Sequence, residues 1–418
     1  MERGTGVGTG AGVGAGAGAG ARAGAGAGTS TGPGTGTSPG AGAGAAAGSG
    51  PSGVNLPALR SHNAALLLDL LRTAGREGIS RLELAERTGL TPQAVSKITA
   101  RLRSEGLAAD AGRRASTGGK PATVLRLVPE AGHAIGLHLD RDELTAVLLD
   151  LAGVRVALRR APLDLGAGAE PVLTTVRAEV AALLGPEAPR PLPVRLLGVG
   201  VAMPGPLDHR AGTPGRVTGF PQWDGFPLRD ELARRLGAPV VLDKDTNAAA
   251  LGLALRPGAP GSFAYVHLGT GLGAGLVLGG AVLRGGRTGA GELGHQTVQL
   301  DGPACDCGGR GCLEVLCLAA LARGDLDGAA RVLGTGAANL VRLLDVDRVL
   351  LGGRAVLAAP EAFARGTREV LGGLGLPADV AVAAGPYAVA EGAAQLILAP
   401  VFGREPSGLG GEPRMIGP

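Results

Sequence analysis

The spacing of hydrophobic and polar positions changes along the chain and divides it into distinct stretches. Residues 1–53 consist mainly of Gly, Ala, Ser, Thr and Pro and have almost nothing to bury. Such a composition cannot offset the entropy lost on ordering, so it predicts a disordered tail. Residues 403–418 are expected to form a second, flexible tail at the C-terminal end.

Residues 54–128 show the spacing of short helices followed by a hairpin. Leucines and alanines over 61–73 predict a mostly buried helix. The capping-box pattern Ser80-Arg-Leu-Glu83 opens a second helix. Thr91-Pro92 opens a third helix, which ends near Gly106. Residues 107–128 predict a β-hairpin with a tip rich in Gly and Arg. Together these elements predict a winged helix-turn-helix domain.

The third helix of this domain is the expected DNA reader. With Val95, Ile98 and Leu102 facing inward, a polar face projects outward. Gln can hydrogen-bond adenine, Lys can reach guanine or phosphate, and Ala can touch a thymine methyl group. A small three-helix bundle with a solvated polar face is the alternative. The predicted base contacts are Gln93, Ser96, Lys97 and Ala100, and the predicted phosphate contacts are Arg101, Arg103, Arg113, Arg114 and Lys120.

The distribution of charge supports a nucleic-acid partner. The whole chain has a net charge of +4, a weak signal by itself. Residues 54–128 contain twelve Lys and Arg against six Asp and Glu, whereas the remainder is slightly acidic. A basic module on a neutral-to-acidic body is typical of a DNA reader joined to another domain, and operator DNA is the expected partner. An incidentally basic helical face would give the same count.

From His133 onward the pattern alternates between strands and helices, which predicts an α/β architecture with at least two lobes over 133–402. The predicted strands are Ile135–Leu139, Leu144–Asp150, Leu196–Ala202, Val240–Leu242, Phe263–Leu268, Leu276–Leu278 and Arg348–Leu351. The predicted helices are 171–184, 228–236, 245–255, 313–323 and 388–398.

Composition narrows the class of protein. Hydrophobic residues make up 45% of the chain, enough for two or more domain cores. Aromatic residues make up only 2%, so these cores must be built from Leu, Val and Ala. No apolar run reaches membrane-spanning length, and the N-terminus lacks a signal-peptide pattern. We therefore expect a soluble, cytoplasmic protein without a membrane partner.

The four cysteines lie close together, which favours a metal site over a disulfide framework. The spacing His295-x9-Cys305-x-Cys307-x4-Cys312 supplies one nitrogen and three sulfurs. This donor set suits a tetrahedral Zn²⁺, and no open position remains, so the expected role is structural. Three buried, reduced cysteines are the alternative, and Cys317 is expected to be a core residue.

Five segments of the second part carry distinctive motifs, namely Gly198–Asp208, Asp243–Leu251, Leu268–Gly275, Gly291–His295 and Cys305–Glu314. They resemble motifs of the ROK family (repressors, open reading frames and kinases), and the resemblance covers nearly all of residues 55–400. It implies a winged helix-turn-helix followed by a two-lobed, actin-like ATPase (ribonuclease H-like) sugar-kinase fold, with the ligand cleft between the lobes.

The resemblance also implies a set of sugar contacts. Carboxylates accept hydrogen bonds strongly from sugar hydroxyls, and in a kinase of this family the aspartate also acts as general base. Lys244 stands where the kinases usually have Asn. Its charge could favour an anionic ligand such as a sugar phosphate, or it could pair with a neighbouring residue. Gly219 stands where a sugar-contacting Asn is common. The implied contacts are Lys244, Asp245, Glu292, His295 and Glu314.

On the nucleotide side the resemblance is incomplete. The glycine-rich segment 269–275 resembles a second phosphate loop, with Gly269, Thr270, Gly271 and Gly273 as candidate backbone donors. The first phosphate loop aligns with 138–142, where His138 replaces a metal-facing aspartate and Asp140 and Arg141 replace glycines. These side chains block close approach to phosphate, and the carboxylates of the loop would repel an anion. Loss of phosphoryl transfer is therefore expected, with Asp245 a vestigial base.

Two functions fit this sequence. The first is a sugar-responsive transcription regulator of carbohydrate metabolism, usually a repressor, that binds a sugar or sugar-phosphate effector and works as a homodimer or homotetramer. The second is an ATP-dependent, glucokinase-like sugar kinase. The aspartate, the glycine-rich loop and the zinc motif favour the kinase, whereas the winged helix and the altered first loop favour the regulator.

Overall fold

The structure is a computed structural model that describes residues 62–114, 122–185, 195–383 and 385–404. The expected N-terminal tail and most of the expected C-terminal tail lie outside these residues. Gly403 and Arg404, at the start of the latter, are described, and Arg404 pairs with Asp69 at 2.8 Å. Within the described residues, no helix combines the length and the apolar character needed to cross a membrane.

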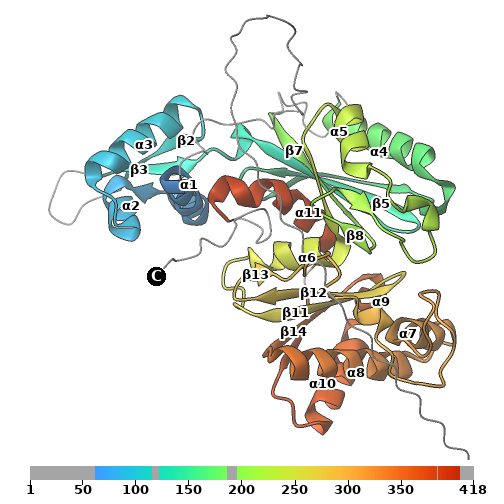
Figure 1. Cartoon of the computed structure of the whole chain (residues 1–418). Helices are drawn as coiled ribbons and strands as arrows, with labels where there is room; N and C mark the ends of the chain where they lie inside the picture. Colours follow the sequence, from blue (N-terminus) through green and yellow to red (C-terminus); the bar gives the residue numbers. More distant parts are fainter. Residues whose placement is uncertain (1–61, 115–121, 186–194, 384, 405–418) are drawn as a thin grey trace, which may run out of the picture. The chain divides into compact units, whose positions relative to one another are not determined.

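The N-terminal part is a winged helix-turn-helix, as predicted (Figure 1). Ser80 caps the second helix and forms the complete capping box with Glu83. Thr91 caps the third helix, with proline at its first position. The three strands pair in the order β1-β3-β2. The elements are α1 (His62–Ala74), β1 (Ile79–Ser80), α2 (Arg81–Thr88), α3 (Pro92–Ser104), β2 (Ala108–Arg114) and β3 (Ala122–Leu127).

The first lobe is built on a five-stranded sheet in the order β10-β7-β4-β5-β6. Its β4-β5-β6 part is an antiparallel meander, and β7 and β10 are added in parallel. Two helices, α4 and α5, pack their apolar sides on this sheet. The elements are β4 (His133–Leu139), β5 (Glu143–Asp150), β6 (Arg155–Pro162), α4 (Ala169–Leu184), β7 (Leu196–Met203), β8 (Leu207–Asp208), β9 (Thr213–Pro214), α5 (Leu228–Leu236) and β10 (Val240–Lys244).

The second lobe has a sheet in the order β13-β12-β11-β14-β15. Helices α8 and α10 lie side by side against it (Figure 1). The elements are β11 (Phe263–Leu268), β12 (Leu272–Leu278), β13 (Ala281–Val282), α7 (Leu313–Ala322), α8 (Leu326–Leu344), β14 (Arg348–Gly352), α9 (Arg354–Ala358), α10 (Pro360–Gly373) and β15 (Asp379–Val382). The two-lobed α/β fold is confirmed, although β6, β8, β9, β13, β15, α8, α9 and α10 were not among the predicted elements.

One prediction in this lobe is wrong. The expected loop 269–275 is a loop only as far as Gly271, because β12 begins at Leu272 and pairs with β11. Gly273 and Gly275 therefore lie in a strand. A Cβ at Gly275 would lie 2.1 Å from the carbonyl oxygen of Thr246, so this glycine is required for close packing of a helix rather than for phosphate binding.

A pair of small-residue helices, α6 (Asp245–Ala254) and α11 (Ala388–Leu398), packs against strands of both sheets. Backbones approach very closely here. A Cβ at Gly200 would lie 1.8 Å from the oxygen of Ala393, and a Cβ at Gly392 would lie 1.9 Å from the oxygen of Ala248. The chain thus compensates for its scarcity of aromatic side chains by bringing backbones together.

This packing predicts opposite effects for one substitution at two helical glycines. Gly392→Ala is expected to lower the free energy of unfolding by about 1–3 kcal/mol, because the added methyl group overlaps the α6 backbone. The methyl group of Gly372→Ala in α10 meets no atom of the described residues within 4 Å, and the substitution should stabilise the protein by up to about 1 kcal/mol through helix propensity. Denaturant unfolding measures both, and a stabilising Gly392→Ala would contradict the packing.

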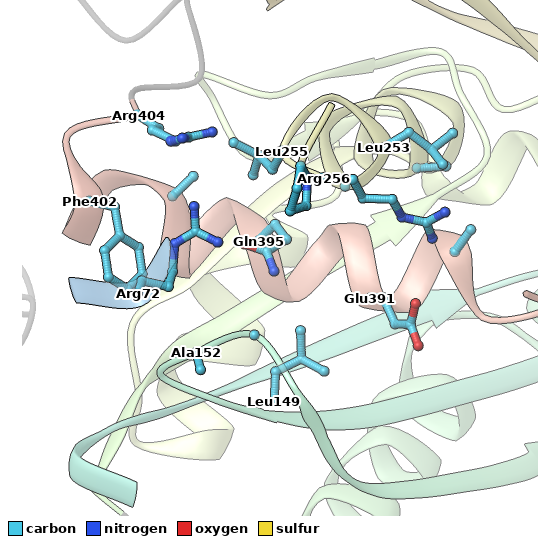
Figure 2. A pocket seen from close by; sticks show the side chains of 16 residues that line it. Arg72, Leu149, Ala152, Leu253, Leu255, Arg256, Glu391, Gln395, Phe402 and Arg404 are labelled. Atoms are coloured by element: carbon cyan, nitrogen blue, oxygen red, sulfur yellow. The ribbon is translucent and has the colours of Figure 1, made fainter. Parts of the chain in front are cut away.

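The winged helix shares a hydrophobic core with the first lobe. Leu67 and Leu71 of α1 belong to the same buried cluster as Leu149 of β5 and Phe402 of the final turn, Ala399–Phe402. Arg72 also stacks 5.2 Å from the centroid of the Phe402 ring, as Figure 2 shows from close by. With the Asp69–Arg404 ion pair, these contacts fasten α1 to the end of α11.

Candidate functional site

The predicted sugar contacts converge on one pocket of about 60 Å³. It lies where β10 meets α6, opposite the β11–β12 turn and the start of α7. Gly269 is not in its wall, whereas Arg141 and Thr218 line it and were not predicted as sugar contacts. The predicted residues in the wall are Lys244, Asp245, Glu292, His295 and Glu314, together with Thr270, Gly271 and Gly273.

Asp245 is the first residue of α6, and its Oδ1 accepts a hydrogen bond of 2.6 Å from the backbone N–H of Thr246. Burial raises the pKa of Asp245 to about 7, although the positive charge of Lys244 and the Thr246 hydrogen bond oppose the shift. A carboxyl group with a pKa near neutrality can accept a proton from a hydroxyl group or bind that hydroxyl as an ionised acceptor.

Asp245→Asn is expected to stabilise the unliganded protein above neutral pH. A raised pKa means that the folded state favours the protonated aspartate, and this contribution is lost as pH rises from about 4, where the unfolded chain ionises, to about 7. Removing the charge should therefore add about 1–2 kcal/mol at about pH 8, and the gain should shrink as pH falls from about 7 to about 4. Thermal unfolding of both proteins across this range measures the effect. A gain independent of pH would contradict it.

Lys244 is paired with a neighbour, one of the two roles considered from the sequence. Its Nζ donates to Glu292 Oε1 at 2.9 Å and to the oxygen of Ala290 at 2.5 Å, and its side chain is 3% exposed. Gly205 makes room for it, because a Cβ there would lie 2.8 Å from Lys244 Cδ. Lys244 therefore orients Glu292 toward the pocket.

Glu314 occupies the first turn of α7 and is buried. Its Oε2 accepts a hydrogen bond of 2.7 Å from the backbone N–H of Leu272, at the start of β12. A Cβ at Gly271 would meet both Glu314 Oε2 at 2.8 Å and Arg141 Nη2 at 3.4 Å. The glycine thus keeps space open between this carboxylate and Arg141.

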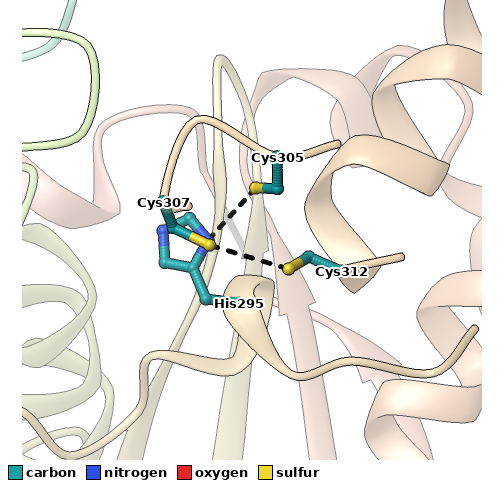
Figure 3. A group of neighbouring side chains, drawn as sticks. All are labelled: His295, Cys305, Cys307 and Cys312. Atoms are coloured by element: carbon teal, nitrogen blue, oxygen red, sulfur yellow. Dashed lines mark hydrogen bonds between the residues drawn. The ribbon is translucent and has the colours of Figure 1, made fainter. Parts of the chain in front are cut away.

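The two ring nitrogens of His295 face two different sites. Its Nδ1 lies 3.7 Å from Cys305 Sγ, and its Nε2 lies 3.5 Å from Thr218 Oγ1 on the pocket side. Figure 3 shows the imidazole beside the sulfurs of Cys305, Cys307 and Cys312. One face of this histidine can therefore serve a metal while the other faces the pocket.

The four predicted metal ligands are brought together. Their ligand atoms all lie within 4.8 Å of one another. The sulfurs of Cys307 and Cys312 are 3.7 Å apart, and two thiolates on one tetrahedral zinc ion would be separated by about 3.8 Å. The backbone N–H of Gly309 donates to Cys307 Sγ at 3.4 Å, as is common for metal-bound thiolates. The cluster can hold a metal ion.

An ion-pair cluster joins the two lobes at the predicted first phosphate loop. Arg354, at the start of α9, donates to Asp142 at 2.9 and 2.5 Å and to Asp140 at 3.1 Å. Asp140 Oδ1 also accepts a 2.7 Å hydrogen bond from Thr270. Burial alone would raise the pKa of Asp140, but the surrounding cations and donors hold it below its ordinary value. The two carboxylates, expected to repel an anion, are thus bonded within the protein.

Helix α3 presents the predicted face to solvent, with Val95, Thr99 and Leu102 buried behind it. Arg101 lies 3.8 Å from Glu105, and Arg103 pairs with Asp110 of β2 at 2.9 Å. The exposed predicted contacts are Gln93, Ser96, Lys97, Ala100, Arg101 and Arg103. The backbone of Arg113 and Arg114 lies in β2, but their side chains, like all of Lys120, fall outside the described part of the wing.

Known proteins match the winged helix and the two-lobed part of this chain separately. The family profile described as "ROK family" matches residues 136–323, and the profile for winged helix-turn-helix DNA-binding domains matches residues 67–108. The solved ROK hexokinase from Thermus thermophilus is 34% identical, with a TM-score of 0.51, over 63% of this chain and 96% of that one. The chain belongs to the ROK family.

Two further similarities concern regulators. The solved structure of a ROK family transcriptional regulator, a homolog of the E. coli MLC protein, has a TM-score of 0.66 and covers 82% of this chain and 98% of that one. Its identity is 21%, so it supports the fold alone. The xylose repressor of Caldicellulosiruptor bescii is 30% identical over 240 residues, 56% of this chain, and the match spans 59% of that repressor's length.

Proposed function

We propose that this ROK protein is a DNA-binding transcription regulator, usually acting as a repressor, whose ROK domain binds a sugar or sugar-phosphate effector without phosphorylating it. The observation that carries the proposal is that one chain combines the exposed polar face of α3 with a pocket whose lining includes the acidic side chains of Asp245, Glu292 and Glu314. The repressor relative supports it. We assign residues 54–128 to the DNA-binding domain and 133–402 to the ROK domain.

In the effector pocket, the three carboxylates and His295 Nε2 are assigned to the sugar hydroxyls. Lys244 is already engaged by Glu292, so it is assigned to orienting that carboxylate. Arg141 makes no ion pair with any described residue and stacks 5.7 Å from the centroid of the Phe220 ring. It is the cation that would receive the phosphate of a phosphorylated effector.

Absence of phosphoryl transfer is inferred from the ion-pair cluster between the lobes. Arg354, Asp140 and Asp142 bond to one another in the region where the family's first phosphate loop would cradle a nucleotide. A nucleotide phosphate would have to displace these bonds, and no glycine backbone is available for it at Asp140 or Arg141.

The metal is assigned as a structural Zn²⁺ held by His295, Cys305, Cys307 and Cys312. Three sulfurs and one nitrogen at this spacing suit zinc and leave no position for a substrate. When bound, zinc would supply charge that keeps the three thiols ionised and fixes the tautomer of the histidine. The cluster then holds the segment that carries Glu292 next to the pocket.

Regulation would follow from a population shift. An effector that binds the closed cleft more tightly than the open one changes the relative position of the lobes. Since α1 shares a core with the first lobe, this change reaches the DNA-reading helices. Two such helices in a homodimer or homotetramer would need a fixed separation to match two operator half-sites.

A sugar kinase is the second candidate, because Asp245 has a pKa near 7 and the hexokinase relative is 34% identical. Two assays on the purified full chain separate the functions. Gel shifts with the DNA upstream of its own gene should show binding that a sugar or sugar phosphate changes. ATP turnover with a panel of sugars should stay at background, and turnover at an enzyme-like rate of about 1 s⁻¹ or more without DNA binding would reverse the assignment.

A further inference from the structure

A second cavity, of about 200 Å³, lies away from the effector pocket and shares no residue with it. It is bounded by α1 of the winged helix, by the C-terminal end of α6 and by α11 with the final turn of the chain (Figure 2). Its floor is apolar and includes Leu149, Leu253 and Phe402. Nothing in the proposed function uses this cavity.

The wall of this cavity carries more positive than negative side chains. Among the described residues, three guanidinium groups line it, those of Arg72, Arg256 and Arg404, against one carboxylate, that of Glu391. That carboxylate is already bonded to Arg155 at 2.5 Å. Arg72 and Arg404 are held in place by one shared carboxylate, Asp69, which contacts them at 2.6 and 2.8 Å. The wall therefore carries two more positive than negative charges.

The side-chain amide of Gln395 lies in the middle of this wall. Gln395 projects from α11 between Arg72 and Glu391 (Figure 2), and its side-chain amide forms no hydrogen bond with any described residue. Arg72 lies in the last turn of α1 and Arg256 follows the end of α6, where the helix carbonyl groups carry a partial negative charge that offsets part of this positive charge. An anion here would be held by guanidinium and amide groups, whose N–H donors match phosphate oxygens.

We propose that this cavity binds a small phosphate ester, distinct from the sugar effector, and that its occupancy strengthens the attachment of α1 to the ROK domain. The excess positive charge attracts the phosphate group of such an ester, and the apolar floor suits a short carbon skeleton. The ten-residue helix α6 begins with Asp245 in the effector pocket and ends at this cavity, so the two sites are about 15 Å apart along one rigid element. This coupling rests on the proposed function.

Binding is tested on the full chain with inorganic phosphate and 3-phosphoglycerate, by calorimetry and thermal shift at constant ionic strength. Both probes should stabilise the protein, 3-phosphoglycerate more than phosphate. Arg256→Gln and Arg404→Gln should each weaken 3-phosphoglycerate binding about tenfold, since each removes a charged hydrogen-bond donor. Arg256 is exposed, so its replacement should leave the fold intact.

Two control variants test whether binding is specific to this cavity. Arg365→Gln, at an exposed position of α10, should leave binding unchanged, and so should Glu292→Gln in the effector pocket. Equal affinity in wild type and Arg256→Gln would overturn the proposal, as would no binding at about 10 mM, where even a millimolar Kd would be detected. Operator binding by Arg256→Gln without the probe should match wild type, so failure of this site is distinguishable from failure of the regulator assignment.

Discussion

Replacing Gln93 and Lys97 together with alanine is expected to abolish operator binding while leaving the effector response intact. Both side chains are exposed on α3, on the face opposite the buried Val95 and Leu102. Each base contact of this kind contributes about 1–3 kcal/mol, so losing both should weaken binding at least about thirtyfold. Gel shifts at one fixed salt concentration measure the loss, since salt alone changes the affinity.

The matched control is Arg365→Ala on α10, a comparable loss of an exposed side chain far along the chain from α3. It should bind the operator as the wild type does. Effector-induced thermal stabilisation should be the same in all three proteins, because the pocket is unchanged. An unaltered gel shift for the double variant would show that α3 is not the helix that reads the operator.

Cys312→Ser is expected to remove the metal and with it the order of the effector pocket. Cys312 is 1% exposed and directly precedes the helix that carries Glu314, while the ring of His295 faces both the cluster and the pocket. Metal content should fall from about one zinc per chain to near zero, because three ligands cannot close the tetrahedral set. Sugar binding should weaken at least about tenfold, and the protein should unfold several degrees earlier.

Cys317→Ser provides the matched cysteine control. Cys317 is fully buried on the same helix, and its Sγ faces the carbonyl oxygen of Ala329 at 3.6 Å rather than the cluster. This variant should keep its zinc and its sugar affinity. Elemental analysis measures the zinc content of the two variants, and calorimetry measures their sugar affinity. A wild-type protein without zinc would exclude the structural metal site.

Local signals predicted the winged helix accurately. The Ser80–Glu83 capping box and the Thr91-Pro92 pair act over three or four residues, so the sequence alone contains the information. The His-Cys spacing also predicted a cluster that the structure brings together. In each case the interacting groups are close in the chain or belong to a donor set of restricted chemistry.

Contacts between segments that are far apart in the chain could not be predicted from the sequence. The glycines after Gly271 suggested a phosphate loop, but Gly275 is needed because the Thr246 backbone approaches it, and that approach depends on how α6 packs. Arg354 pairs with Asp142 across 212 positions of the chain, and nothing near either residue marks the pair. Helix α8, by contrast, has an apolar side of regular spacing that could have been found.

The hydrophobic core that α1 shares with the first lobe limits how the winged helix-turn-helix domain can be replaced by that of another protein. A transplanted winged helix would arrive with its own α1, and Leu67, Leu71 and Asp69 must meet Phe402 and Arg404 of the recipient. These two partners lie at the opposite end of the chain. Operator preference can therefore be changed most safely by substitutions on α3, and chimaeras joined near residue 128 should also carry the donor's last turn.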